Sequence, residues 1–117
     1  MTIRDIMVLL DAKLLCGEEW LDKEVKMACG SDLMSDVLAY VKEQSVLLTG
    51  LVNPQSVRTA EMLDIICLVY VRGKIPTPEM IALANASGIT VLRTNTHMFT
   101  ACGILYAHGM RGGINCD

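Results

Sequence analysis

The chain has 117 residues, a net charge of −3 at neutral pH and a sequence pI near 5.3. This length can bury one hydrophobic core but is too short for two ordinary domains. The acidic balance argues against a nucleic-acid-binding protein, which needs a basic face. No apolar stretch reaches the roughly 18 residues of a membrane span, and residues 1–11 contain acidic side chains, unlike a signal peptide. We therefore expect a cytoplasmic protein with neither a nucleic-acid nor a membrane partner.

Apolar residues are abundant for a domain of this size. The hydrophobic types make up 52 % of the chain, and nine glycines come in addition. Soluble domains usually contain about 45–50 % apolar residues with glycine included. A small domain cannot bury this excess by itself, and the simplest partner that could cover it is a second copy related by a two-fold axis. The composition thus predicts a homodimer.

The sequence offers no pattern for metal or cofactor chemistry. Its cysteines are odd in number and form no Cys-x-x-Cys pair: Cys16, Cys29, Cys67, Cys102 and Cys116. His97 and His108 lie eleven positions apart on one predicted helix, about 16 Å, so they cannot share a metal ion. Phosphate-binding glycine motifs and a recognisable nucleophile–base pair are also missing. We predict no metal, no cofactor and no enzymatic activity.

The first third of the chain predicts two helices and two short strands. Thr2 and Asp5 form a capping-box pattern before a helix over residues 3–10. Strand-like segments at 13–16 and 24–29 flank a glycine and a polar turn, which suggests a small peripheral hairpin. A second helix begins after Ser31 or Asp32 as its cap and ends near Lys42.

The remainder alternates strands with capped helices. Apolar strands are predicted at 46–49, 65–71 and 89–92. Asn53-Pro54 and Thr77-Pro78 are cap-plus-proline helix starts, the first helix reaching Leu63, and Gly88 stops the second. Residues 94–96 open a last helix that Gly109 closes.

This alternation is typical of an α/β fold. We predict a small three-layer domain with a mainly parallel sheet, a βαβαβα C-terminal part, and a peripheral N-terminal helix with short strands. Right-handed crossovers place the carboxyl ends of parallel strands at one edge of the sheet.

Polar residues follow each of the three strands and are therefore expected to meet at that edge. Open α/β sheets bind ligands beyond the carboxyl ends of their strands, where helix N-termini offer free N–H groups to anions. Arginine forks suit phosphate or carboxylate groups. Solvation is an alternative explanation, because the first residue beyond a strand is commonly exposed. The candidate ligand-binding residues are Thr49, Gly50, Asn53, Arg72, Gly73, Arg93, Thr94 and Thr96.

Several short motifs, in their order and spacing, resemble a known family. These are Arg72-Gly73-Lys74, Pro78-Glu79 before an apolar helix, and the run from Gly88 to Thr94, Gly-Ile-Thr-Val-Leu-Arg-Thr. The chain resembles stand-alone members of the DRTGG domain family and the non-catalytic N-terminal domain of HPr kinase/phosphorylase. The resemblance implies one α/β domain over residues 1–110, accompanying regulatory modules such as CBS domains and lacking catalytic activity. Residues 111–117 are expected to form a loose tail.

Two functional hypotheses remain. The first is a non-catalytic regulatory module that senses a small anionic or phosphorylated ligand at the sheet edge and acts with a regulatory protein partner. The second is an obligate dimeric structural or adaptor subunit with no small-molecule ligand. The second hypothesis predicts that Arg72 and Arg93 can be replaced without affecting partner binding.

Overall fold

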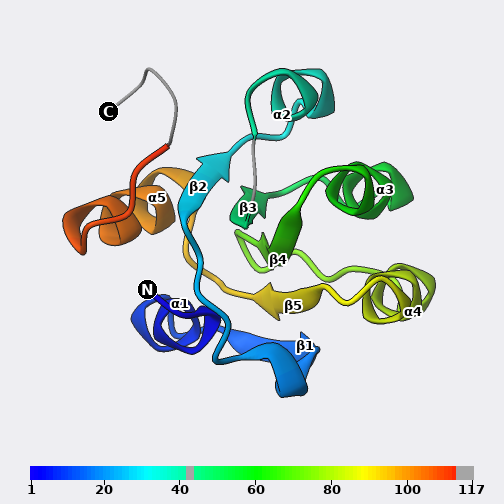
Figure 1. The fold of residues 1–117 in the computed structure, drawn as a ribbon, viewed down its shortest axis with the longest axis horizontal. Helices are drawn as coiled ribbons and strands as arrows, with labels where there is room; N and C mark the ends of the chain where they lie inside the picture. Colours follow the sequence, from blue (N-terminus) through cyan, green and yellow to red (C-terminus); the bar gives the residue numbers. More distant parts are fainter. Residues whose placement is uncertain (42–43, 113–117) are drawn as a thin grey trace.

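The computed structural model describes residues 1–41 and 44–112, which form five α-helices, a short 3₁₀ turn and five strands (Figure 1). In chain order these elements are α1 (Ile3–Leu9), β1 (Lys13–Cys16), η1 (Glu18–Trp20), β2 (Met27–Gly30), α2 (Met34–Tyr40), β3 (Ser45–Thr49), α3 (Pro54–Met62), β4 (Ile65–Tyr70), α4 (Pro78–Ala86), β5 (Thr90–Arg93) and α5 (Met98–Ala107). The α/β class predicted from the sequence is confirmed.

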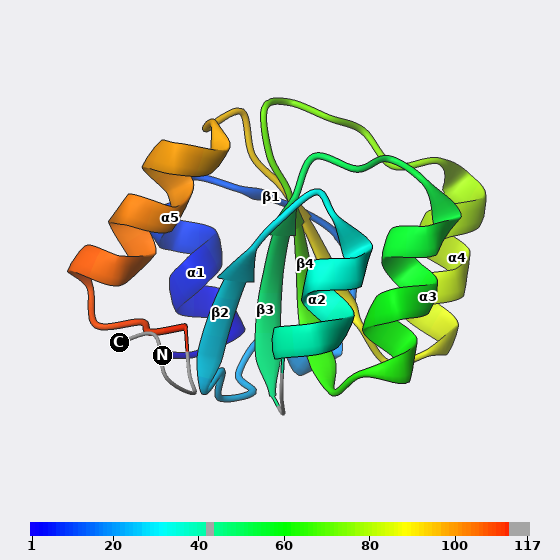
Figure 2. The same cartoon turned by 90° about the horizontal axis from the view of Figure 1, so that it is seen from above.

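One five-stranded sheet with the order β1-β5-β4-β3-β2 forms the middle layer. Strands β2 to β5 run parallel, and β1 closes the β5 edge as an antiparallel strand. Helices α2, α3 and α4 cover one face of the sheet, while α1 and α5 cover the other (Figure 2). The predicted three layers and mainly parallel sheet are therefore present, with three successive βαβ units where the sequence pattern indicated two.

The predicted hairpin between the two N-terminal strands is wrong. β1 pairs with β5 and β2 pairs with β3, so the two strands lie at opposite edges of the sheet. The connecting segment contains the 3₁₀ turn η1, but it does not fold β2 back onto β1, and its backbone bonds to the start of the chain instead. The amide of Arg4 donates to the carbonyl of Leu21 at 2.8 Å, and that of Val25 donates to the carbonyl of Met1 at 2.8 Å.

Helix starts follow the sequence signals in three of five cases. Thr2 and Asp5 form the predicted capping box, and Asn53 and Thr77 cap α3 and α4. Neither Ser31 nor Asp32 caps α2, which begins after Leu33 without a side-chain cap. α5 begins only at Met98, because residues 94–96 form a turn that bonds to neighbouring loops.

The core consists of two apolar layers, one on each face of the sheet. Leu10, Leu92 and Leu105 belong to the layer beneath α1 and α5, and Leu68 and Tyr70 to the layer beneath α2–α4. The buried hydroxyl of Tyr70 lies 2.8 Å from the Ser56 hydroxyl, so this polar group has a partner. The central strands thus bury apolar side chains on both faces of the sheet, as parallel strands covered by helices require.

The start of the expected C-terminal tail is attached to the domain. The carbonyl of Arg111 accepts a hydrogen bond from the amide of Ala28 at 3.0 Å, and its guanidinium stacks 3.8 Å from the centre of the Tyr106 ring. Residues 113–117, including Cys116, lie outside the described residues.

Gly17 and Gly88 provide a matched test of the packing around β5. Both have a positive φ, which disfavours any side chain, but a Cβ at Gly17 would also lie 2.6 Å from Cα of Thr90, whereas one at Gly88 would meet nothing within 4 Å. We predict that Gly17→Ala lowers the free energy of unfolding by about 2–5 kcal/mol and Gly88→Ala by about 1–2 kcal/mol. Urea unfolding measures both, and equal losses would contradict the packing described here.

Candidate functional site

The loops that follow β3, β4 and β5 lie together on one side of the sheet, as the sequence predicted (Figure 2). Backbone hydrogen bonds join two of them directly. The amide of Arg72 donates to the carbonyl of Thr96 at 3.0 Å, and the amide of Gly73 donates to the carbonyl of Thr94 at 2.9 Å. These contacts fix the relative positions of the loops, but they also occupy two N–H groups that an anion could otherwise have used.

Thr94 and Thr96 form hydrogen bonds that connect the loop after β5 to its neighbours. Thr94 is 2 % exposed, and its hydroxyl donates to the carbonyl of Leu10 at 2.7 Å. The same hydroxyl oxygen accepts the amide of Thr96 at 3.1 Å. A hydroxyl with these partners is buried and satisfied, so Thr94 supports the loops structurally.

Thr49, Gly50 and Arg72 meet around a carboxylate. Oδ1 of Asp32 accepts the amide of Gly50 at 2.6 Å and the hydroxyl of Thr49 at 3.2 Å. Its other oxygen lies 3.9 Å from Nη2 of Arg72, in a half-exposed ion pair. Such a pair contributes at most about 1 kcal/mol, because solvent screens it. Arg72 is therefore held near the site but can still turn towards another anion.

The backbone conformation of Arg72 directs its side chain over Gly50. Arg72 and Gly73 both adopt positive φ, 59° and 69°, which reverses the chain directly after β4. A Cβ at Gly50 would lie only 2.6 Å from Nη2 of Arg72. Glycine at position 50 thus permits the close approach of the guanidinium to the end of β3.

Arg93 is the last residue of β5 and has an unusual environment. It lies opposite Tyr70 in the parallel register, and side-chain alternation places it on the same face of the sheet as Val91. Its Nε is buried and has no hydrogen-bond acceptor within residues 1–41 and 44–112. Buried donors are almost always paired, so this atom marks the edge as a place where an acceptor is expected.

The other candidate residues contribute less to a common site. Oδ1 of Asn53 accepts the amide of Gln55 at 2.8 Å, and the Thr77 hydroxyl accepts that of Met80 at 3.2 Å, so α3 and α4 have capped N-termini. α5 begins after His97 without a side-chain cap. Among the helices that follow parallel strands or open from this edge, α2 and α5 are therefore the two without a side-chain cap.

Asp32 is the site residue that the sequence analysis missed. The sequence analysis interpreted it as a possible helix cap and placed the strand before it in a hairpin. Once β2 is known to be parallel, Asp32 stands just beyond its carboxyl end, like the polar residues after the other strands. Residues 27–40 repeat the order of strand, polar loop and helix seen in the later units, and this repetition was the signal that could have identified Asp32.

The described residues were compared with the requirements of a metal site and of a reactive thiol. No group of three or more His, Cys, Asp or Glu side chains is placed there to hold a metal ion. Burial raises the pKa of Cys16, Cys29, Cys67 and Cys102 above the ordinary thiol value, so these thiols stay protonated near neutral pH.

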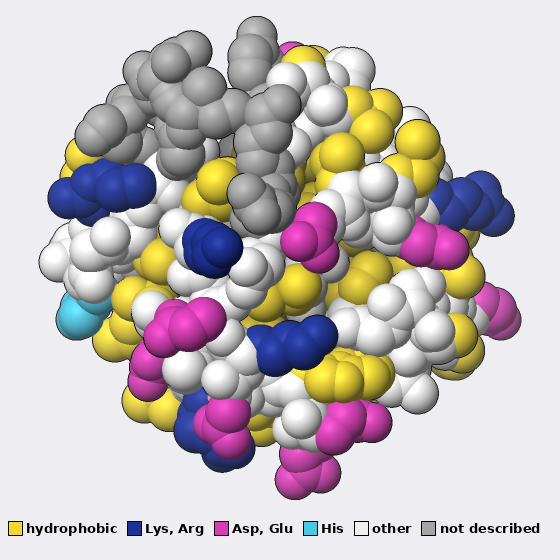
Figure 3. Space-filling view, viewed as in Figure 1, with side chains coloured by type: hydrophobic (Ala, Val, Ile, Leu, Met, Phe, Trp, Pro, Cys, Tyr) yellow, Lys and Arg dark blue, Asp and Glu magenta, His cyan; other side chains and the backbone are white. Residues whose placement is uncertain are grey.

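Positive and negative side chains are interspersed on the face shown in Figure 3.

The fold and this edge define a small α/β domain whose polar loops gather beyond the carboxyl ends of four parallel strands. A family model described as the DRTGG domain matches residues 5–107, and the chain belongs to that family. None of its described helices has the length and hydrophobicity that a bilayer crossing requires.

A solved structure has the same fold. It contains the CBS and DRTGG domains of the regulatory region of Clostridium perfringens pyrophosphatase, in complex with the activator diadenosine tetraphosphate. The TM-score is 0.71 at 21 % identity, over 89 % of this chain and 45 % of that one. This chain therefore spans less than half of the length of that regulatory-region chain. No curated protein matches the sequence.

The Asp32 contacts predict a stability effect that can be measured separately from ligand binding. Asp32→Ala removes the acceptor of the buried Gly50 amide, and we expect it to lower the free energy of unfolding by about 1–3 kcal/mol. Glu61→Ala, which removes an exposed carboxylate from α3, should leave that free energy within about 0.5 kcal/mol of the parent. Chemical denaturation of both variants tests this, and an Asp32→Ala protein as stable as the parent would refute it.

Proposed function

We propose that this DRTGG domain is a non-catalytic regulatory module that senses a small anionic or phosphorylated ligand. The ligand site is the edge formed by Asp32, Thr49, Gly50, Arg72 and Arg93, beside the N-terminus of α5. The domain acts with a partner protein and as a homodimer. Cytoplasmic location is part of this proposal.

The unpaired Nε of Arg93 is the observation that carries the proposal. A buried donor without an acceptor costs about 1–3 kcal/mol, and an anionic oxygen is the acceptor that would recover most of that cost. Arg72 supplies a second guanidinium at the same edge. Its ion pair with Asp32 is weak enough for an anionic ligand to replace the carboxylate. The uncapped N-terminus of α5 favours the same sign of charge.

The comparison with the solved structure supports the same ligand class. The regulatory region of the clostridial pyrophosphatase was crystallised with an activator that is itself a tetraphosphate.

Thermal unfolding in the presence of inorganic tripolyphosphate and of a dinucleoside polyphosphate tests whether the folded domain binds such ligands. A ligand that binds only the folded state must raise the melting temperature, and by an amount that grows with ligand concentration. Sodium sulfate at equal ionic strength controls for a general salt effect.

Charge variants at the edge should change this affinity in opposite directions. We expect Arg72→Ala and Arg93→Ala each to weaken polyphosphate binding by about 1.5–3 kcal/mol, roughly 10- to 150-fold. Asp32→Asn retains an acceptor for Gly50 but removes the competing charge beside Arg72, so binding should tighten. Isothermal titration calorimetry measures all three variants.

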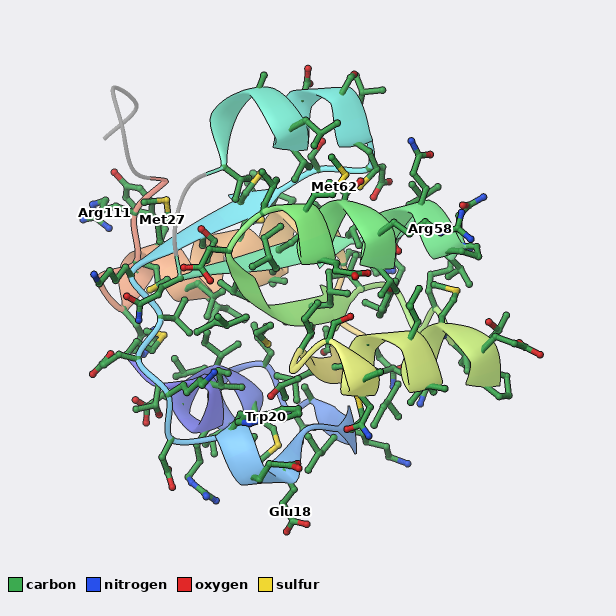
Figure 4. The ribbon with its side chains drawn as sticks, turned by 45° about the vertical axis from the view of Figure 1, so that its right-hand side comes forward. Glu18, Trp20, Met27, Arg58, Met62 and Arg111 are labelled. Carbon is green, nitrogen blue, oxygen red and sulfur yellow. The ribbon has the colours of Figure 1, made fainter. Side chains whose placement is uncertain are left out.

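Arg58 provides the matched control, because it is an exposed arginine on α3 that projects from the domain (Figure 4). Arg58→Ala should leave polyphosphate affinity unchanged. If all three arginine variants lose affinity equally, the binding is a diffuse charge effect and the site is wrong. If the parent binds no polyphosphate and the variants keep partner binding, the adaptor hypothesis replaces the ligand-sensing one.

A further inference from the structure

α5 differs from the other helices in its complete lack of charge. Its ten residues, Met-Phe-Thr-Ala-Cys-Gly-Ile-Leu-Tyr-Ala, include no Asp, Glu, Lys, Arg or His. Each of the other four α-helices among the described residues carries at least one charged side chain. A helix without a charged face is normally buried on all sides, yet in the single chain α5 packs on the sheet through Ala101 and Leu105 only on one side.

The outward face of α5 has large residues at its ends and small ones between. Phe99 is 90 % exposed and Tyr106 is 50 % exposed. Thr100, Gly103 and Ala107 are exposed beside them, and a Cβ at Gly103 would meet nothing within 4 Å. At 100° per residue these five residues occupy one arc of about 120° on the helix. They form a continuous surface, the α5 face.

A hollow of about 500 Å³ adjoins the C-terminal end of α5 and is lined by Met1, Arg4, Asp5, Val8, Leu9 and His108. Val8 is 71 % exposed, so the hollow has an apolar wall. The charges at its rim have partners within the chain. Arg4 pairs with Asp22 at 2.9 Å, and the Asp5 carboxylate accepts the amide of Thr2. α5 thus has an exposed phenyl ring near its N-terminal end, and a hollow formed mainly by residues of α1 lies beside its C-terminal end.

In a two-fold dimer each patch on one subunit meets its complement on the other, and an aromatic ring beside a hollow is suited to such an exchange. If two copies of α5 cross antiparallel at Gly103, Phe99 of each copy lies opposite Ala107 of the other, next to the hollow. Tyr106 then lies opposite Thr100. A parallel crossing would instead place Phe99 on Phe99 and leave a gap at Gly103.

We propose that the α5 face, together with the hollow beside α1, is the surface through which two copies of this chain associate, with their α5 helices antiparallel about Gly103. This inference deepens the homodimer part of the proposed function and is independent of the ligand site. The two aromatic side chains supply on the order of 300 Å² of buried area, and a stable dimer buries about 800 Å² per subunit. Val8, the hollow and the helix backbone between the aromatics provide further area.

The experiment measures the mass of the full chain by light scattering, and its dimer dissociation constant by analytical ultracentrifugation. The parent should have twice the chain's 12.8 kDa at micromolar concentration. Phe99→Glu places a carboxylate in the apolar contact and should weaken association roughly 30-fold or more. The fold should survive, because an acidic residue suits the first turn of a helix.

Met62→Glu is the matched control. Met62 is 74 % exposed and lies at the end of α3, on the opposite face of the sheet from α5 (Figures 2 and 4). This variant should remain a dimer. A second interface variant, Gly103→Gln, substitutes a better helix former where the single chain has open space, so the monomer keeps its fold while the helix crossing is obstructed. It should dissociate like Phe99→Glu.

Adding Ala107→Lys to Phe99→Glu tests the direction of the helices. Association should be restored in part, because the antiparallel crossing brings these two positions of different subunits together. Failure of this rescue would overturn the antiparallel arrangement. A parent dimer that persists in both Phe99→Glu and Gly103→Gln would overturn the assignment of the α5 face alone, and a monomeric parent would overturn the homodimer itself.

Discussion

The parallel hydrogen bonding of β2 to β3 is the constraint on which the rest of this structure depends. It pairs Met27 with Ser45 and Gly30 with Leu48, and so makes β2 the first of four parallel strands. Asp32, the second residue beyond the end of β2, is thereby placed where it can bond to Gly50 and face Arg72. The same pairing leaves β1 free to close the other edge against β5, and α1 free to cover the face that it shares with α5.

Much of the fold follows from local sequence signals, and the exceptions have physical causes. Asn53-Pro54 and Thr77-Pro78 define their helices because cap and proline act within one turn. The partner of a short strand such as 13–16 is not a local property: β1 pairs with β5, about 80 positions along the chain, and the hairpin assignment failed for that reason. Thr94 was recognised as an edge residue, but its buried bond to Leu10 depends on a contact 84 positions away along the chain. Asp32 was missed for a similar reason, because its place at the edge depends on the pairing of β2 with β3.

The proposed ligand site and the α5 face meet at one element. Residues 94–96 bond to Arg72 and Gly73, and α5 begins two residues later, so Phe99 lies within one turn of the edge. A ligand that moved the Arg72 loop would therefore act on the turn that positions the aromatic end of the proposed dimer contact. This turn could therefore couple ligand binding to association of two copies. Such coupling is reciprocal: a ligand that favours association binds more tightly to the associated form.

The central claim is that the buried Nε of Arg93 is a ligand donor, and NMR of the arginine side chains tests it most directly. The Nε–H signal of Arg93, assigned by its loss in Arg93→Lys, is followed during titration with tripolyphosphate. We predict a saturable shift of this signal, with the same dissociation constant as the calorimetric titration and with Arg58 unaffected. A ligand that binds while the Arg93 signal stays unchanged would contradict the account.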